Sequence, residues 1–293
     1  QKGSEGRYPA DLLIKWKMQH EQRIEILTSI APERKSNVVL YGANIGFEKS
    51  PINYHACVEA MFPNWYPATE KPVTLSMVSE LKDHSEQYWQ AESQHLTKRF
   101  QSKISSIIEE DSCKHFSLFA LAPQPLLIKL GALLTDKIEV ETYQLHREPK
   151  GWFWQDCTDD FEYIINRPQN MDGKPALVLS LSDNVSHKRI TRVMGPDTSI
   201  WEVTIKQPHN DFMKSKQQLS LFRKCIRKLI VEIKNAHGDA TPLQIFPVMP
   251  VSCAVELGRA RMPKADMTWL IYDHDIKTQQ FVLAIELRGD LHE

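Results

Sequence analysis

Apolar runs that do not alternate with polar residues, separated by longer helical stretches, are the feature that most limits what this chain can form. Runs such as Val38 to Tyr41 and Ala176 to Leu179 have no polar face, so they predict strands that are buried on both sides. Such strands are typical of a parallel sheet covered by helices on both faces, and the predicted fold class is α/β. The predicted strands cover residues 37–42, 73–78, 115–121, 139–143, 151–154, 175–181, 199–205, 242–246, 269–272 and 281–286.

The same order of elements occurs twice along the chain. Each half has one very long amphipathic helix, predicted at 84–110 and at 215–236, followed by a strand that stops at a proline-rich turn. Identity between the halves is slight, so the duplication is one of architecture. We expect two tandem Rossmann-like units, each a mainly parallel sheet flanked by helices, at residues 37–170 and 171–293. Shorter helices are predicted at 52–61, 126–134, 187–194 and 252–261.

Residues 1–36 differ from the rest of the chain. Apolar residues recur at helical spacing between residues 12 and 27, and Pro32 ends the pattern. The chain begins at Gln1 rather than at Met, so we expect a longer protein in which this helix links a missing upstream effector to the body. The basic stretch around Trp16 also suits a juxtamembrane connector, which keeps membrane attachment through the absent segment open as an alternative.

The composition is that of an ordinary globular protein and argues against several classes. Hydrophobic residues make up 42% of the chain, charged residues 25%, and the formal net charge is −1. No overall basic field would attract long nucleic acid, so a polyanionic ligand must be met by a local basic patch. No apolar run approaches the roughly 20 residues that a bilayer span needs. The five scattered cysteines, without a C-x-x-C pair, favour a reduced cytoplasmic protein.

The usual catalytic signatures are absent from the sequence. There is no G-x-S-x-G elbow, H-E-x-x-H motif, phosphate-binding loop or G-x-G-x-x-G. The stretch from Gly42 to Gly46 is a G-x-x-x-G of weak specificity, and His274, between two aspartates, fits a solvated turn better than a metal site. We therefore predict a binding module rather than an enzyme, with no catalytic residue, no metal and no cofactor.

A ligand of an open α/β sheet binds beyond the carboxyl ends of the strands. Two loops in each half qualify by this rule: 42–50 and 122–125 in the first, 182–187 and 247–252 in the second. Each loop leads into a helix whose first N–H groups are unpaired and carry partial positive charge, which suits an anion. Two halves that face one another would surround a single ligand with four such loops, as a small ring of phosphates requires.

Several residues in or near these loops allow two interpretations. Gly42 either lets the backbone approach a ligand or forms a plain turn, and Asn44 either binds a base or ribose or caps a turn. Lys206 and Lys264 are candidates to neutralise a phosphate, or are solvated surface lysines. Arg259 is a similar candidate, or it pairs with a carboxylate.

Two tryptophans flank Phe153 in a predicted strand. Successive side chains of a strand point to opposite faces, so one face of this segment belongs to the core. Trp154 is the candidate for stacking on a base, a contact worth roughly 1–3 kcal/mol.

Long segments in both halves resemble the signature segments of the SAVED family. The second half carries IFPVMPVSCAVELGR at 245–259 and MPKADMTWLIYD at 262–273. The first half carries FSLFALAPQPLLIKLG at 116–131 and YQLHREPKGWFW at 143–154. The resemblance extends over about residues 37–288.

This resemblance implies a fold and a function. SAVED domains are similar to two fused CARF-type Rossmann-like units, and they act as sensors in CBASS, a bacterial anti-phage system. They bind cyclic tri- or tetranucleotides, often adenine-rich, made by a cGAS/DncV-like nucleotidyltransferase. Binding drives head-to-tail oligomerisation, which activates a fused effector. Carried onto this chain, the resemblance implies a pocket lined by Gly42, Asn44, Ile45, Pro123, Gln124, Pro125, Ser182, Lys206, Pro247, Pro250 and Lys264.

Two other functions stay open at this point. One is a ring phosphodiesterase that cleaves the cyclic oligonucleotide, for which His55 and His187 are the histidines nearest to the candidate loops. The other is a general nucleotide-binding Rossmann-like protein, which would bind ATP about as well as the ring. The preferred hypothesis is a cytoplasmic bacterial sensor that binds no long nucleic acid.

Overall fold

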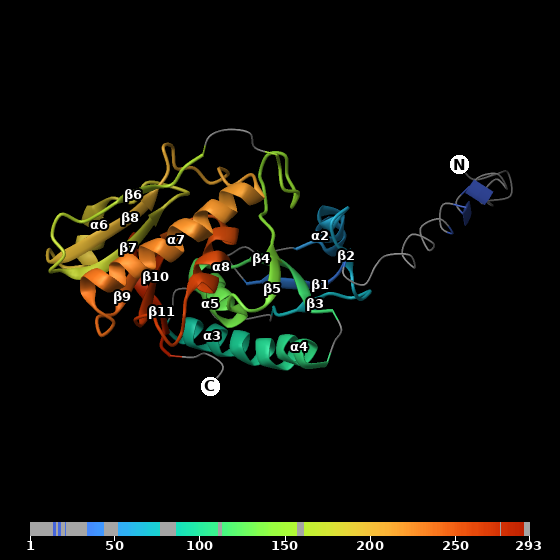
Figure 1. The fold of residues 1–293 in the computed structure, drawn as a ribbon, viewed down its shortest axis with the longest axis horizontal. Helices are drawn as coiled ribbons and strands as arrows, with labels where there is room; N and C mark the ends of the chain where they lie inside the picture. The colour runs from blue at the N-terminus through green and yellow to red at the C-terminus, as the bar shows by residue number, and fades with distance from the viewer. Residues whose placement is uncertain are drawn as a thin grey trace.

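Two sheets, one from each half of the chain, lie on either side of a central pair of helices (Figure 1). This arrangement is seen in a computed structural model. It describes residues 14, 15, 17, 18, 21, 34–43, 52–76, 86–110, 113–156, 161–275 and 277–289. Residues 14, 15, 17, 18 and 21 are helical, and the rest of the predicted linker helix lies outside the described residues. The α/β prediction is confirmed.

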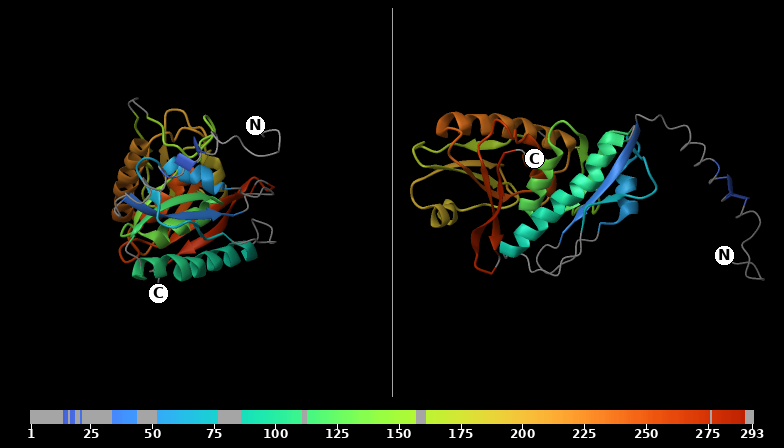
Figure 2. Two further views of the ribbon diagram at one scale, coloured as in Figure 1. Left: turned by 90° about the vertical axis from the view of Figure 1, so that its right-hand side faces the viewer. Right: turned by 90° about the horizontal axis from the view of Figure 1, so that it is seen from below.

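The first half is a parallel sheet with the strand order β2-β1-β4-β5, in which β3 also pairs with β1. The helix predicted at 84–110 is present over residues 86–110 as α3, the π-helical turn η2 and α4, which continue one another below this sheet (Figures 1 and 2); residues 84 and 85 lie outside the described residues. The elements are β1 (Lys35–Gly42), α2 (Tyr54–Met61), β2 (Tyr66–Pro67), β3 (Val73–Thr74), α3 (Glu86–Phe100), η2 (Gln101–Ser105), α4 (Ser106–Glu110), β4 (His115–Leu121), α5 (Gln124–Leu134) and β5 (Glu139–Thr142).

Both faces of this sheet are covered. Val39 and Tyr41 of β1 belong to the core cluster that includes α3 and α5. Val38 and Leu40, the alternate residues, belong to a separate cluster with α2. The absence of a polar face along the strand is therefore explained by helices on both sides.

The second half is a larger mixed sheet with the order β11-β10-β9-β7-β8-β6. Strands β10, β9, β7 and β8 pair in parallel, and the edge strands β11 and β6 are antiparallel to their neighbours. The elements are β6 (Ile164–Asn166), β7 (Lys174–Ser180), α6 (His187–Met194), β8 (Thr198–Thr204), α7 (Lys216–His237), β9 (Leu243–Val248), α8 (Val251–Ala260), β10 (Trp269–Asp275) and β11 (Gln280–Leu287).

Helices α5 and α8 occupy equivalent places in the two halves and pack on each other at two glycines. A Cβ atom on Gly131 would lie 2.0 Å from the Val255 carbonyl oxygen, and one on Gly258 would lie 1.9 Å from that of Ile128. Only glycine allows backbones to approach so closely. The largest hydrophobic cluster runs through this crossing into both sheets, so the two halves share one core.

Some strand predictions differ from the structure. The strand predicted at 73–78 is present only as β3, Val73–Thr74; residues 75 and 76 are irregular, and residues 77 and 78 lie outside the described residues. Residues 151–154 do not form a strand: Gly151 makes an isolated bridge to His146, and the following residues are irregular. Strand β9 does not stop before Pro247 but continues to Val248. Beyond Ile245 it pairs only with β7, so a residue without an N–H is tolerated at Pro247.

Strand β6 was not predicted. It precedes the expected boundary at residues 170/171, yet it pairs with β8 in the second sheet. By strand pairing, residues 164–166 therefore go with the second half. Within the described part of the chain, no helix is long and apolar enough to cross a bilayer.

Candidate ligand-binding site

A cavity of about 490 Å³ opens where carboxyl ends of strands from both sheets come together. It lies beyond β4 and β5 of the first half and beyond β7, β8 and β9 of the second. This is the position at which open α/β sheets bind their ligands. The lining residues are Leu121, Gln144, Leu145, His146, Arg147, Lys150, Ser182, Asn210, Met249, Pro250 and Val251.

The loop after β5 forms one wall of the cavity and is held from the opposite half. Its ends are joined by backbone hydrogen bonds between His146 and Gly151, at 2.8 and 3.4 Å. The carboxylate of Asp211, from the segment before α7, accepts the backbone N–H groups of Arg147 at 3.0 Å and Glu148 at 3.3 Å. One acidic side chain of the second half thus fixes the cavity loop of the first.

Lys214 strengthens this attachment. Its ammonium forms an ion pair with Asp211 and donates a hydrogen bond to the Glu148 carbonyl at 2.8 Å. Burial raises the pKa of Asp211, but the hydrogen bonds from Lys214 and from the Arg147 backbone outweigh it and keep the pKa below its usual range. Asp211 is therefore ionised at neutral pH, which makes its hydrogen bonds charge-assisted.

The cavity loop carries two exposed cations. Arg147 and Lys150 line the cavity, and neither side chain forms a hydrogen bond or ion pair with the residues that the structure describes. Because the net charge of the chain is −1, this pair is a local basic patch rather than part of a general positive field. Unengaged cations beside a concave site are suited to phosphate groups.

The amino terminus of α8 opens onto the same cavity. Met249, Pro250 and Val251 line it, and Pro250 is the N-cap residue. Gln144, from the loop after β5, accepts hydrogen bonds from the backbone N–H of Ser252 at 3.2 Å and from its hydroxyl at 2.8 Å. The predicted anion-binding helix terminus is thus present at the site, with one of its N–H groups already used by the protein.

His146 is one of the buried residues of the cavity wall, with Gln144, Met249 and Pro250. Only 1% of its surface is exposed, and neither ring nitrogen has a hydrogen-bond partner among the described residues. Burial lowers the pKa of His146 below 6.5, the nearby charge of Lys214 lowers it further, and Asp211 acts in the opposite direction. The imidazole is therefore neutral at physiological pH.

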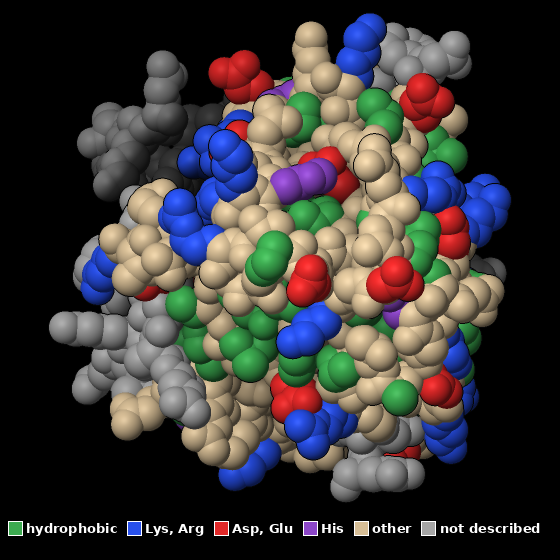
Figure 3. Space-filling view, turned by 90° about the vertical axis from the view of Figure 1, so that its left-hand side faces the viewer, with side chains coloured by type: hydrophobic (Ala, Val, Ile, Leu, Met, Phe, Trp, Pro, Cys, Tyr) green, Lys and Arg blue, Asp and Glu red, His purple; other side chains and the backbone are tan. Residues whose placement is uncertain are grey.

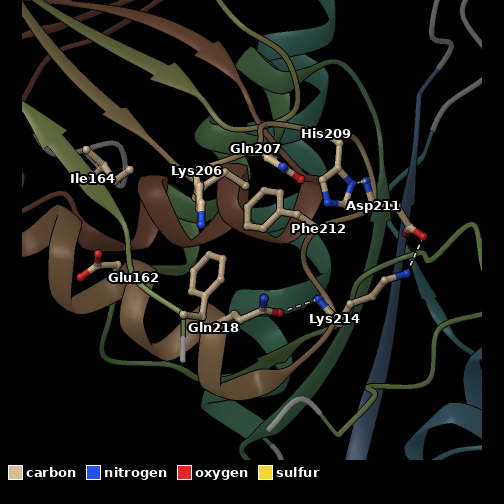
Figure 4. Close-up of a pocket in the computed structure, with 11 residues that line it drawn as sticks. Glu162, Ile164, Lys206, Gln207, His209, Asp211, Phe212, Lys214 and Gln218 are labelled. Carbon is tan, nitrogen blue, oxygen red and sulfur yellow. Dashed lines mark hydrogen bonds and ion pairs between the residues drawn. The ribbon is translucent and has the colours of Figure 1, made fainter. Parts of the chain in front are cut away.

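A second cavity, of about 740 Å³, is lined in part by residues 205–214 (Figure 4). Its lining comes from the second sheet and the segment around it, and Lys206 projects between Ile164 and Phe212 (Figure 4). Asp211 and Lys214, which also line it, are engaged with each other. The smaller cavity is the better candidate, because it draws residues from both halves and offers two unengaged cations.

Three predicted residues lie at the smaller cavity or directly beside it. Ser182 and Pro250 line it. The side-chain oxygen of Gln124 accepts the backbone N–H of Met249, a lining residue, at 3.2 Å. Trp154 lies behind the wall, with its ring edge-on to that of His146 at 5.8 Å between centroids.

Four further predicted residues cap, end or lie within helices and strands of the fold. Pro123 is the N-cap of α5, and Pro125 and Pro247 are buried in α5 and β9. Gly42 ends β1 and donates its N–H to the Ser76 hydroxyl at 2.6 Å. None of the four lines the smaller cavity.

Arg259 does not face the cavity as a free cation. It donates to the carbonyls of Thr135, Ile138 and Val140 at 3.0, 2.8 and 3.3 Å, and it pairs with Glu256 at 3.1 Å. Of the two interpretations of Arg259, the structure therefore shows the pairing with a carboxylate.

The remaining predicted residues are dispersed. Lys206 lines the neighbouring cavity. Lys264 is exposed in the turn that follows the carboxyl terminus of α8, whereas the amino terminus of α8 is at the cavity, so Lys264 does not line the smaller cavity. Asn44 and Ile45 lie outside the described residues.

The sequence analysis did not select the loop after β5, which supplies both cations of the smaller cavity. Gln144, His146, Arg147 and Lys150 follow a predicted strand at 139–143, so the rule that selected the other loops applied here too. The signal that could have identified this loop is the presence of a histidine, an arginine and a lysine within five positions. Asn210, by contrast, had none.

The two histidines considered for catalysis lie elsewhere. His55 is exposed on α2, and His187, at the start of α6, lies 3.3 Å from the Glu202 carboxylate. Neither lines the smaller cavity. Among the described residues, no group of three or more His, Cys, Asp or Glu side chains is placed to hold a metal ion.

The family is decided by a match to the SAVED profile, described as the SMODS-associated and fused to various effectors sensor domain, over residues 96–287. This chain belongs to the SAVED family. The match covers more than half of the chain and runs from α3 through the cavity loop to the end of β11. The resemblance seen in the sequence is thereby confirmed. No curated protein matches the chain.

Solved structures show the same fold. The Acinetobacter baumannii Cap4 SAVED/CARF-domain containing receptor with the cyclic trinucleotide 2′3′3′-cAAA is 12% identical, with a TM-score of 0.57 over 86% of this chain and 51% of that one. The same receptor with 3′3′3′-cAAA gives a TM-score of 0.54 at 12% identity, covering 86% and 52%. The Moraxella osloensis Cap4 receptor gives 0.51 at 12% identity, covering 87% and 50%. This SAVED chain therefore spans about half the length of the receptors it matches.

Proposed function

We propose that this SAVED domain senses a cyclic oligonucleotide in a CBASS antiviral effector and binds it in the cavity between its two halves. The preferred ligand is a cyclic trinucleotide such as cyclic tri-adenylate. The observation that carries the proposal is the pair of unengaged cations, Arg147 and Lys150, on a loop that Asp211 fixes at the junction. Three ring phosphates would be met by these cations and by the amino terminus of α8. Support also comes from the Cap4 receptors of the same fold, two of which hold a cyclic trinucleotide.

Binding at a junction between halves also accounts for a signal. A ligand that contacts both walls binds best to one arrangement of the halves, and only such differential affinity shifts a conformational equilibrium. In this proposal the favoured arrangement associates head to tail with further copies and so clusters an effector outside this chain. A cGAS/DncV-like nucleotidyltransferase would supply the ring.

Titration calorimetry with cyclic tri-adenylate tests the binding step. The double variant Arg147→Glu, Lys150→Glu is expected to lower affinity at least tenfold, since reversing two charges at phosphate contacts costs more than about 1.4 kcal/mol. Lys264→Glu, an equal reversal on an exposed turn beyond α8, is the matched control and is expected to change affinity less than about twofold. Unchanged affinity of the double variant would contradict the assignment of the cavity.

Two further measurements separate this proposal from its alternatives. Chromatography after long incubation should recover the ring intact, whereas linear fragments at a catalytic rate would indicate a ring phosphodiesterase. ATP should compete weakly; comparable affinity for ATP would indicate a general nucleotide-binding protein. Sedimentation with and without the ring tests association, and a sedimentation coefficient that does not rise would contradict the oligomerisation step.

A further inference from the structure

Two glutamines of the first half hold the turn of the second half that lines the cavity and begins α8. The side-chain oxygen of Gln124 accepts the backbone N–H of Met249 at 3.2 Å. The side-chain oxygen of Gln144 accepts the backbone N–H of Ser252 at 3.2 Å and its hydroxyl at 2.8 Å. Gln144 and Met249 are themselves buried lining residues of the cavity. The protein therefore supplies its own acceptors where the cavity meets the amino terminus of a helix.

These contacts use most of the N–H groups that this turn can offer to a phosphate. Among the four described positions 249–252, Met249 and Ser252 are bonded to glutamine, and Pro250 has no N–H. That leaves the N–H of Val251. In the proposed function the same terminus meets a ring phosphate, so the phosphate and the glutamine side chains compete for the same donors.

A phosphate is the stronger acceptor of the two. A carboxamide oxygen is neutral, and both of its bonds to a backbone N–H are 3.2 Å long, at the upper end of the usual range. A phosphate oxygen is charged, so its hydrogen bonds are about twice as strong, and the helix dipole favours it further. Arg147 and Lys150, on the loop that continues from Gln144, add attraction for the same ligand. A ring phosphate can therefore displace the glutamines.

We propose that Gln124 and Gln144 are built-in competitors of the ring: they occupy the amino terminus of α8 in the ligand-free domain, and a ring phosphate displaces them. The inference rests on the proposed function and adds to it how the site is regulated. Displacement replaces direct links between the halves by a link through the ring, and it releases the loop after β5 from α8. The resting and ligand-bound domains then differ at the junction, as a sensor requires.

Replacement by methionine removes the acceptor and keeps an unbranched side chain. Gln144→Met leaves the N–H and hydroxyl of Ser252 without their partner, so the thermal midpoint of the ligand-free domain should fall. Because the competitor is gone, affinity for cyclic tri-adenylate should rise about twofold to tenfold in titration calorimetry, which is the contribution of a typical neutral hydrogen bond. Gln124→Met should also bind more tightly, with a smaller loss of midpoint because Gln124 is only half-buried.

Gln244→Met is the matched control. Gln244 is also buried, and it accepts the Tyr272 hydroxyl at 2.9 Å and donates to the Pro242 carbonyl at 3.2 Å. It lies on β9 and lines neither of the two cavities. This variant should lose thermal stability as Gln144→Met does, yet bind the ring with wild-type affinity. The comparison separates competition from the general effect of losing a buried amide.

A second measurement uses the wild-type protein. In nuclear magnetic resonance spectra, saturation with cyclic tri-adenylate should shift the side-chain amide signals of Gln124 and Gln144 towards those of solvent-exposed glutamines. The signals of Gln244 should not move. Unshifted signals of Gln124 and Gln144 in the complex would show that neither side chain is displaced, which overturns the inference whatever the variants do.

The outcomes distinguish this inference from the proposed function. If wild-type protein binds no ring, both are overturned. If Arg147→Glu, Lys150→Glu loses binding while either methionine variant at position 124 or 144 binds the ring no more tightly than wild type, the function stands and the inference is overturned, because that glutamine is then a brace or a ligand contact. Tighter binding by both variants, with Gln244→Met unchanged, supports the competition.

Discussion

Asp211 shows how one side chain far away in the sequence shapes the cavity wall. Its carboxylate accepts two consecutive backbone N–H groups, those of Arg147 and Glu148, which belong to the other half. A pair of N–H groups pointing at one ionised carboxylate fixes the direction of the backbone. The cations on the loop are therefore held in place before any ligand arrives, which reduces the entropy that binding must overcome.

Asp211→Asn should lower affinity for cyclic tri-adenylate about tenfold, because the amide loses the charge that strengthens both hydrogen bonds and the ion pair with Lys214. Calorimetry is the measurement. Glu162→Gln, which removes an exposed carboxylate at the neighbouring cavity, is the control and should bind like wild type. Equal affinities for the two variants would show that the loop does not depend on Asp211.

At the scale of elements, the contact between α5 and α8 sets the geometry of the site. Each helix starts at the carboxyl end of its sheet, and they cross at Gly131 and Gly258. The two backbones lie so close at this crossing that neither glycine has room for even a methyl group. The crossing therefore fixes α8, whose amino terminus lines the cavity, against α5 of the first half.

Gly131→Ala should destabilise the protein by about 1–3 kcal/mol, the usual cost of overpacking. In an unconstrained helix the same change is stabilising by up to about 1 kcal/mol, so the sign itself is diagnostic. Urea denaturation measures the effect, and affinity for the ring should fall with it. A gain in stability would mean that the helices can move apart freely.

A buried ion-pair network also joins the two halves. Glu256 on α8 pairs with Arg259 at 3.1 Å and Arg223 at 2.8 Å, and accepts the Thr142 hydroxyl at 3.0 Å. Burial raises the pKa of Glu256, but the charge of Arg259 and the hydrogen bond from Arg223 outweigh it and keep the pKa low. Arg259 in turn reaches three carbonyls around β5, so its role is to hold α8 against the first sheet.

Arg259→Ala should lower the free energy of unfolding by about 3–5 kcal/mol, because it leaves a buried carboxylate with one partner fewer and three carbonyls unpaired. Arg227→Ala is the matched control: its guanidinium, on α7, also joins the second half to the first, at Asp136, but both side chains are about half exposed. That variant should lose no more than about 1 kcal/mol. Similar losses for the two variants in urea denaturation would contradict the structural role of Arg259.

Considered as a whole, the molecule has two sheets but one continuous core. Its charges are mixed: on the end face of the second half, basic and acidic side chains are interspersed with apolar ones (Figure 3). In the first half, the half-buried His115 stacks on Trp65 at 3.5 Å between ring centroids and lies 2.8 Å from the hydroxyl of the buried Ser36. Burial lowers the pKa of His115 to about 4, with Glu141 opposing the shift and Lys216 adding to it.

This shift predicts how stability depends on pH. The unfolded chain takes up a proton at His115 near pH 6.5, whereas the folded chain does so only near pH 4, so the free energy of unfolding should decrease as the pH falls between these values. His146 and His237, whose pKa values burial also lowers, add to the slope. Glu256 and Asp211 have lowered pKa values, so their contribution is lost only below about pH 4.

Urea denaturation at several pH values between about 4.5 and about 8 would measure the slope, a window that brackets the unperturbed pKa of histidine. His115→Phe keeps a ring against Trp65 without a titrating group, so its stability should depend less on pH than that of wild type. Parallel curves for the two proteins would contradict the assignment of the slope to His115.

The local pattern was sufficient to predict the α/β class and the duplicated order of helices and strands. Apolar runs without alternation indicate strands of a sheet that is covered by helices on both faces. It was not sufficient at Pro247, where a missing N–H predicts a break but one-sided pairing removes the need for a donor. It also missed β6, whose three residues become a strand only by pairing with β8.

By itself, then, the sequence determined which loops end strands and so which positions lie at the cavity, since the end of a strand depends on neighbours along the chain. Ser182 and Pro250 were identified in this way. Only the tertiary structure decided that Arg259 binds Glu256 and the carbonyls around β5 and is not available to a ligand. It also decided that Lys264 lies beyond the carboxyl terminus of α8, and that the loop after β5 supplies the cations of the cavity wall. The physical reason is that the partners which position or neutralise a charged side chain can lie far away along the chain. Asp211 is 64 residues from the backbone of Arg147 that it holds, so the residues next to Arg147 in the sequence give no indication of this contact.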